Sequence, residues 1–295
     1  MSKPKSRQQR RAQERDRRER LHSRPQPSSQ RPLLLAAVGV LGVIAVIAAL
    51  VVVRLTQGGT SAAPAKPSGR APAPVVRAVT TVPASLYNLI GYQSALTPLK
   101  RIHGKPLQKG GKPLIVYVGA EYCPLCAAER WALVAALSRF GTFHNLGATH
   151  SSSIDVDPNT PTFSFHGATY TGRYLSLDTV ELTTNRPQGN FYAPLEKPTA
   201  LEQQLSAKYD PNAIPFAYLG SRYIVDTVAF NPAILAGMTM QQVAAAMRNP
   251  SSPICQAILG TANDLTAALC QQTNGKPASV CSSSGVVAAA KHLPA

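Results

Sequence analysis

An apolar run followed by an amphipathic pattern marks residues 112–140 as the centre of the chain. Leu114–Val118 is apolar and rich in β-branched residues, and Pro113 and Gly119 bound it, which predicts a buried strand. The amphipathic segment behind it predicts a helix. Its apolar positions are Trp131, Leu133, Val134 and Leu137.

Further segments alternate between strand and helix patterns. Thr162–Phe165 predicts a strand or hairpin, and Leu201–Tyr209 predicts a helix. An apolar run opened by Pro215 predicts a strand, and a helix capped by Thr239 precedes a longer one over Pro253–Gln272. This mixture predicts an α/β fold with a helical C-terminal part over residues 239–281.

The N-terminal part has no such pattern. Residues 1–31 are rich in Arg, Gln and Ser and predict a disordered basic tail. Leu33–Val53 is uncharged and mostly aliphatic, long enough for a transmembrane helix over residues 32–54. A cleavable signal peptide is the alternative, but its apolar core and basic region would both be shorter. We therefore expect an uncleaved anchor.

The charge distribution sets the expected topology. The formal net charge is +16, and residues 1–54 hold twelve Lys and Arg against three acidic residues. Since this excess precedes the span, we expect a cytoplasmic N-terminus and an extracytoplasmic main domain at the cell membrane. No aromatic residues interleave with the basic tail, and the span separates it from the domain, so we expect no nucleic-acid partner.

Composition also divides the rest of the chain. Residues 55–74 are rich in Ala, Pro and Gly and predict a linker, so we expect the folded domain at residues 75–285. Residues 142–210 contain scattered aromatic residues and short polar runs, which we interpret as an insertion between the amphipathic helix and the strand opened by Pro215.

A Cys-Pro-Leu-Cys motif lies between the central strand and its helix. Cys123 falls at the predicted start of the helix, where free N–H groups and the dipole favour a thiolate. Pro124 suits the first helical position, and Cys126 lies one turn further on, placed to resolve a mixed disulfide. We therefore expect Cys123 as nucleophile and Cys126 as resolving thiol, with no cofactor.

A structural disulfide or half of a zinc site is the alternative for this pair. Zinc would need two more ligands, and the chain has no second Cys-x-x-Cys motif. Acidic and histidine residues between 144 and 166 lack the close pairing of a metal site, so we predict no metal. These residues are His144, His150, Asp155, Asp157 and His166.

The run Ala120–Cys126 resembles the active site of thioredoxin, with Tyr122 where that family usually has Trp. The wider pattern GAEYCPLCAAERWALVAALSRFG resembles the DUF929 family of membrane-anchored, thioredoxin-like proteins of undefined function, over about Val75 to Cys281. The resemblance implies a thioredoxin-like fold.

Two departures from thioredoxin affect the expected chemistry. Tyr117 stands where thioredoxins carry a buried Asp, and the dipeptide between the cysteines lacks the His of strongly oxidising relatives. The direction of electron flow therefore stays open. Without the buried Asp, water or Glu121 would assist proton transfer. For Glu121 itself we expect a solvated surface charge, with tuning of the site as the alternative.

The Ile214-Pro215 step matches the place of the cis proline that faces the Cys-x-x-Cys motif in thioredoxin-like folds. The resemblance implies a cis peptide, with the Ile214 backbone and Pro215 binding the substrate chain beside Tyr122. An ordinary trans proline at a strand edge is the alternative.

Three cysteines lie in the C-terminal part. Cys270 and Cys281 flank a Gly-Lys-Pro turn, and we predict a structural disulfide between them. Cys255 is then left over, and its pairing state stays open.

Together these features predict a membrane-anchored extracytoplasmic thiol–disulfide oxidoreductase. Its partners would be protein thiols and disulfides, together with a membrane-bound redox protein that resets the pair. The hypothesis from another class is a non-catalytic thioredoxin-like binding or assembly module whose Cys123–Cys126 pair is a structural disulfide.

Overall fold

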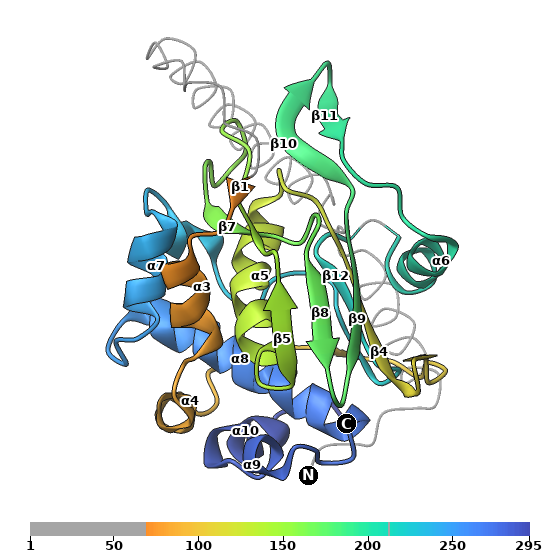
Figure 1. Ribbon diagram of the computed structural model, residues 1–295, viewed down its shortest axis with the longest axis vertical. Coiled ribbons are helices and arrows are strands. Elements are labelled where there is room, and N and C mark those ends of the chain that lie inside the picture. Colours follow the sequence, from red (N-terminus) through yellow and green to blue (C-terminus); the bar gives the residue numbers. More distant parts are fainter. Residues whose placement is uncertain (1–68, 212) are drawn as a thin grey trace, which may run out of the picture. The chain divides into compact units, whose positions relative to one another are not determined.

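A six-stranded sheet forms the centre of the described chain (Figure 1). The computed structural model describes residues 69–211 and 213–295. The sheet consists of β2 (Lys100–Arg101), β3 (Gln108–Lys109), β4 (Lys112–Gly119), β9 (Ser176–Glu181), β12 (Phe216–Leu219) and β13 (Tyr223–Val225). β4 pairs in parallel with β9 and antiparallel with β12 and β3, whereas β13 joins β12 to β2. The predicted α/β class is therefore confirmed.

Strand β4 is buried on both faces because its apolar side chains alternate between two cores. Ile115 and Tyr117 face the larger core, whereas Leu114, Val116 and Val118 face the smaller one. A strand without a solvent face needs helices on both sides of the sheet.

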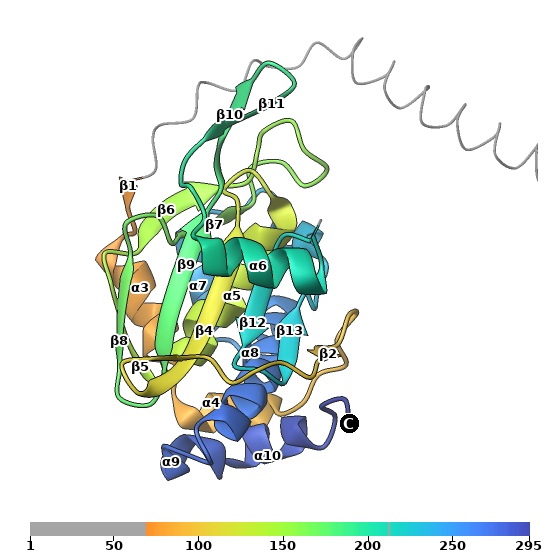
Figure 2. The same ribbon diagram turned by 90° about the vertical axis from the view of Figure 1, so that its right-hand side faces the viewer.

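Helices cover both faces of the sheet (Figure 2). α6 (Ala200–Tyr209) lies on one face and contributes Leu205 to the smaller core. α5 (Pro124–Leu137) and α8 (Pro253–Gln272) lie on the other face and pack against each other. α5 therefore lies between the sheet and α8, which explains why it has almost no solvent-exposed side chain.

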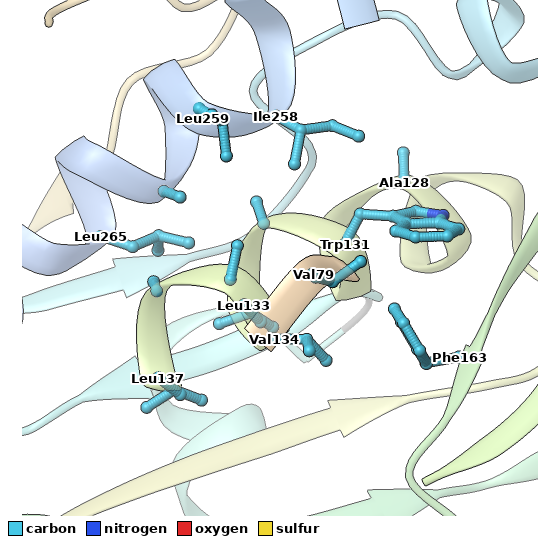
Figure 3. Packing of buried hydrophobic residues seen from close by; sticks show 14 of the residues in the cluster. Val79, Ala128, Trp131, Leu133, Val134, Leu137, Phe163, Ile258, Leu259 and Leu265 are labelled. Atoms are coloured by element: carbon cyan, nitrogen blue, oxygen red, sulfur yellow. The ribbon is translucent and has the colours of Figure 1, made fainter. Parts of the chain in front are cut away.

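The interior around α5 is built from several segments that are distant in sequence (Figure 3). Trp131 and Val134 of α5 lie near Phe163 of β7 (Pro161–Ser164) and Val79 of α3 (Ala73–Thr80). The Trp131 indole donates to the Pro161 carbonyl at 2.8 Å and meets the Phe163 ring edge to face. This side chain joins helix and strand by packing and by a hydrogen bond.

The remaining elements surround this centre. The short strands are β1 (Gly69–Arg70), β5 (Gly141–His144), β6 (Gly147–His150), β8 (Thr169–Gly172), β10 (Thr183–Gln188) and β11 (Phe191–Pro194). The further helices are α4 (Ala84–Ile90), η1 (Pro232–Leu235), α7 (Met240–Ala246), α9 (Ala278–Cys281) and α10 (Ser284–Ala290). β10 and β11 form a hairpin that projects from one end of the sheet (Figures 1 and 2).

Several expected boundaries change. Residues 69–74, expected in the linker, contain β1 and the start of α3, and α10 extends past residue 285. Residues 142–210 are not wholly an insertion, because β9 belongs to the main sheet and α6 covers it. Patterning missed β9 because its first four residues are only half-buried and polar residues such as Asp178 and Thr179 interrupt the apolar run. The strands of residues 142–210 that lie outside the main sheet are β5–β8 and the β10–β11 hairpin.

The C-terminal part agrees with its prediction. Thr239 caps α7 in a capping box with Gln242, and α8 spans the expected residues. Cys270 and Cys281 form the predicted disulfide, with Cα atoms 5.6 Å apart. Cys255 is unpaired and fully buried.

The predicted transmembrane segment and basic tail lie outside the described residues. Within the part of the chain that the structure describes, no helix combines the length and apolar character needed to cross a bilayer.

Replacing Trp131 tests the packing of α5. Trp131→Ala removes a fully buried side chain, so we expect the free energy of unfolding to fall by about 3–5 kcal/mol. Trp131→Phe keeps most of the packing but leaves the Pro161 carbonyl without its donor, a loss of about 1–3 kcal/mol. Urea unfolding followed by far-UV circular dichroism measures both. Equal losses would assign the stability to the hydrogen bond instead of the packing.

Candidate functional site

The two cysteines of the motif lie at the junction of β4 and α5. Cys123 is the N-cap of α5, and its Sγ accepts a hydrogen bond of 3.1 Å from the Cys126 backbone N–H. Pro124 takes the first helical position, where no N–H is lost. Only 4% of Cys123 is exposed, and Cys126 is fully buried.

The structure brings the motif together with the predicted substrate edge. The Ile214-Pro215 peptide bond is cis, as expected. The Cys123 thiol donates to the Ile214 carbonyl at 3.7 Å, across 91 residues of sequence. Cys123, Ile214 and Pro215 therefore form one site, although the sequence separates them widely.

The two thiols differ in acidity. The hydrogen bond with the Cys126 thiol lowers the pKa of Cys123 despite its burial, and the helix N–H groups and the Arg130 charge act in the same direction. Burial and the neighbouring thiol raise the pKa of Cys126 well above its usual value. Cys123 is therefore the thiol that ionises first.

A buried ion pair lies next to the thiols. The Arg130 guanidinium binds both carboxylate oxygens of Glu181, with Nε at 2.8 Å and Nη2 at 2.5 Å. Nη2 also donates to the Ala120 carbonyl at 2.8 Å. Both partners have completely buried side chains, so water screens little of the Arg130 charge, which acts to lower the pKa of both thiols.

Tyr117 and Glu121 line the same buried region. The Tyr117 hydroxyl has no hydrogen-bond partner, and burial raises its pKa well above 10, so it stays protonated. Glu121 is only 2% exposed and accepts a hydrogen bond of 2.6 Å from Ser164. The expectation of a solvated charge at Glu121 was therefore wrong: its side chain is buried beside Ser164 of β7, and its N–H donates to the Thr183 carbonyl of β10.

Tyr122 connects the motif to the β10–β11 hairpin. Its ring stacks on Tyr192 of β11 with centroids 4.1 Å apart and planes 9° from parallel. Its carbonyl accepts a hydrogen bond from the Ser152 N–H at 2.8 Å. Tyr122 therefore fixes two neighbouring segments beside Cys123.

The family model described as "Domain of unknown function (DUF929)" matches residues 98–271, more than half of the chain. The chain belongs to the DUF929 family. The resemblance seen in the sequence is thus confirmed over a shorter range than Val75 to Cys281. Neither the curated proteins nor the solved structures contain a match.

This DUF929 protein also has buried acids outside the motif. Glu129 is 1% exposed, neither carboxyl oxygen has a hydrogen-bond partner, and burial raises its pKa to about 8. Asp264 of α8 lines the same cavity of about 20 Å³, and burial raises its pKa to about 7. A cavity of this size accommodates about one water molecule. Glu129 is therefore mainly protonated at neutral pH, whereas Asp264 is about half protonated there.

Sequence reasoning missed Glu129, Arg130, Glu181 and Tyr192. A signal for the first two was present, because Glu129-Arg130 interrupts an otherwise apolar helix pattern, and charged residues are rarely placed in such a pattern without a specific role. Glu181 and Tyr192 gave no such signal. Glu181 and Tyr192 come close to the motif only through the positions of β9 and β11 in the fold, which the local sequence pattern does not give.

The histidines of the DUF929 chain point to separate partners. His144 bonds to Thr171, His150 to the Ser151 carbonyl and His166 to Glu196. No group of three or more His, Cys, Asp or Glu side chains among the described residues is arranged to hold a metal ion.

Glu129→Gln tests the buried acid. The folded-state pKa of about 8 lies above the ordinary value of 4.5 for a glutamate, so the folded state binds the extra proton between these values. The native chain should therefore lose stability as the pH rises from 4.5 to 8, and Glu129→Gln should reduce that loss. Chemical unfolding at several pH values measures the slope.

The groups facing Glu129 across the cavity enter the same experiment. They are Asp264 of α8 and Asp226, which pairs with Lys100. Glu196→Gln, a partly exposed carboxyl in another part of the fold, serves as the control. The same slope in Glu129→Gln and native chains would contradict the assignment.

Arg130 is tested through the Cys123 thiol. Removing the positive charge in Arg130→Met should move the pH midpoint of Cys123 alkylation upward. This variant leaves Glu181 buried without its partner, at a cost of about 3–5 kcal/mol. Arg130→Met/Glu181→Leu removes both charges and should fold. An unchanged midpoint in the folded double variant would show that Arg130 does not act on Cys123.

Proposed function

We propose that this chain is a thiol–disulfide oxidoreductase built on a thioredoxin-like fold. The observation that carries the proposal is the pair of unlike thiols at the start of α5, with Cys123 facing the Ile214 carbonyl. A helix N-terminus that lowers the pKa of one thiol, beside a buried second thiol, suits thiol–disulfide exchange.

The topology supports the proposed fold. β4, α5 and β9 form a parallel strand–helix–strand unit. After α6, β12 and β13 form an antiparallel hairpin next to β4, and α8 returns to the face covered by α5. This order is the one expected of a thioredoxin-like domain, with β5–β8 added between α5 and β9.

The proposed location rests on the sequence. Leu33–Val53 would anchor the chain in the cell membrane, and the basic residues before it would keep the N-terminus in the cytoplasm. The domain would then act on the extracytoplasmic side, where protein disulfides persist. The Cys270–Cys281 disulfide is consistent with such a compartment.

In the proposed reaction, the Cys123 thiolate attacks one sulfur of a client disulfide. A mixed disulfide forms, the client S–S bond breaks, and one client thiolate leaves. Cys126 then loses its proton and attacks the Cys123 sulfur, which releases the second client thiolate and leaves a Cys123–Cys126 disulfide. Two electrons pass to the client. In the reverse direction, a client dithiol reduces the Cys123–Cys126 disulfide and is itself oxidised.

The positions of the thiols support separate roles in these steps. Cys123 caps α5 and is 4% exposed, whereas Cys126 lies within the helix and is completely buried. Burial disfavours the Cys126 thiolate, and the Arg130 charge opposes this effect. Tyr117 stays protonated, so it accepts no proton from Cys126.

The small exposure of Cys123 favours a second candidate function. A thiol that is only 4% exposed suits a structural pair in a non-catalytic binding or assembly module. The two candidates differ in reduction potential, because structural disulfides lie below about −300 mV.

The reduction potential of the pair decides between them. For the oxidoreductase we expect a value between about −120 and −270 mV, with Cys123 alkylated before Cys126. Glutathione redox buffers combined with mass-spectrometric thiol trapping give the state of each cysteine. A potential well below this range would support the binding module.

Variants at the two cysteines provide the matched comparison. Cys126→Ser should accumulate a mixed disulfide with a disulfide-bonded client, because no thiol resolves it. Cys123→Ser should form none. Equal adduct formation by both variants would contradict their assigned roles.

A further inference from the structure

Three strongly exposed apolar side chains belong to two segments that attach next to Cys123. The large apolar residues with substantial exposure in the described chain are Leu89, Leu96, Ile154, Val156, Phe191 and Val287. Ile154 and Val156 belong to loop 151–160, and Phe191 lies at the tip of the β10–β11 hairpin. The exposed fractions of these three side chains are 72–80%. Among the other three, only Leu96 exceeds the lower of these values, at 73%.

Loop 151–160 holds its apolar residues in a fixed position. The Ser151 hydroxyl donates to the Asp157 carbonyl and accepts from the Thr160 N–H, at 2.7 and 2.9 Å. The Thr160 hydroxyl also donates to the Asp157 carbonyl at 2.9 Å. A loop closed by its own hydrogen bonds presents Ile154 and Val156 without first having to be ordered, which lowers the cost of binding.

The hairpin is fastened to the same region. The Asn185 amide of β10 donates to the His150 carbonyl at 2.9 Å, directly before the loop. Tyr192 of β11 stacks on Tyr122, whose carbonyl in turn accepts from Ser152. Loop and hairpin therefore both attach to the segment that ends in Cys123.

Both segments project beyond the start of α5 (Figures 1 and 2). We define the client-docking surface as loop 151–160 together with Arg186–Tyr192 of the hairpin. Its loop side carries two carboxylates, Asp155 and Asp157, neither of which forms an ion pair with any described residue. Its hairpin side carries Phe191 and exposed Arg186.

We propose that the client-docking surface binds an extended client polypeptide that has apolar and basic side chains close to its reactive cysteine. Ile154, Val156 and Phe191 would contact the apolar side chains, and Asp155 and Asp157 would attract the basic ones. The proposal rests on the proposed thiol–disulfide function, because the surface matters only if Cys123 reacts with a client.

The chemistry of the surface favours this occupant over two others. Two carboxylates beside Ile154 and Val156 oppose contact with an anionic lipid surface. In a symmetric contact between two copies of the chain, Asp155 and Asp157 would lie against the same carboxylates of the other copy or against its Arg186. A polypeptide with apolar side chains and Lys or Arg near its cysteine complements the three apolar residues and the two carboxylates.

The test measures how fast the reduced full-length chain, in detergent micelles, reacts with activated peptides. Each peptide has one cysteine joined by a disulfide to thionitrobenzoate. The Cys123 thiolate attacks the peptide sulfur, the S–S bond breaks, and the coloured thionitrobenzoate anion leaves. One peptide has Leu, Phe and Arg around its cysteine, and its matched partner has Ser, Gln and Glu. We expect the first to react about tenfold faster.

Variants on the surface locate the preference. Ile154→Ser/Val156→Ser/Phe191→Ser and Asp155→Asn/Asp157→Asn should each reduce the preference for the first peptide. Leu89→Ser and Val287→Ser remove exposed apolar side chains from α4 and α10 and should leave that preference unchanged. All variants should react with the small disulfide 5,5′-dithiobis(2-nitrobenzoate) at the native rate, since none is in contact with the thiols.

The outcomes separate the two proposals. If the native chain reacts with the small disulfide but shows no peptide preference, or if the surface variants keep it, the docking inference is wrong and the proposed function stands. If Cys123 reacts with neither the peptides nor the small disulfide, the proposed function fails, and the docking inference fails with it. If the Ile154→Ser/Val156→Ser/Phe191→Ser variant bound lipid vesicles less than the native chain but reacted with the peptides at native rates, the surface would instead be assigned to membrane binding.

Discussion

The burial of α5 on nearly every side is the constraint on which the rest of the structure depends. One face of the helix packs on β4, another on α8, and further contacts come from α3 and β7. Because thirteen of its fourteen residues are buried, the helix has little freedom to shift or tilt. Cys123 caps this helix, so the core of the protein fixes the position of its sulfur.

The same burial explains the ion pair between Arg130 and Glu181. A charge in the middle of a buried helix is costly to desolvate unless its partner and its hydrogen bonds are complete. Glu181 stands at the end of β9 and supplies both oxygens, and Ala120 supplies a carbonyl, although Arg130 Nη1 has no hydrogen-bond partner. The pair adds little net stability by this reasoning. What it does supply is a fixed positive charge close to two sulfur atoms.

The sequence predicts the parts of this site that depend on local pattern. Strand β4, the helix capped by Cys123, the Ile214-Pro215 step and the Cys270–Cys281 pair all follow from short motifs or from the resemblance. The burial of Glu121 and the stacking of Tyr122 on Tyr192 do not, because they depend on where β10 and β11 lie. Strand pairing over such distances is set by the whole fold, which a local pattern does not contain.

Tyr117 stands at the position where thioredoxins carry a buried Asp, so this position places no negative charge beside the thiols. A carboxylate at that position would oppose ionisation of the neighbouring sulfurs, whereas Tyr117 stays neutral. The nearest buried charge that acts on both cysteines is then the Arg130 cation. A cation stabilises the thiolate and hence the reduced form, and a stabilised reduced form is what makes a disulfide a stronger oxidant. In the proposed exchange reaction, this charge would favour passing the disulfide on to a client over accepting one.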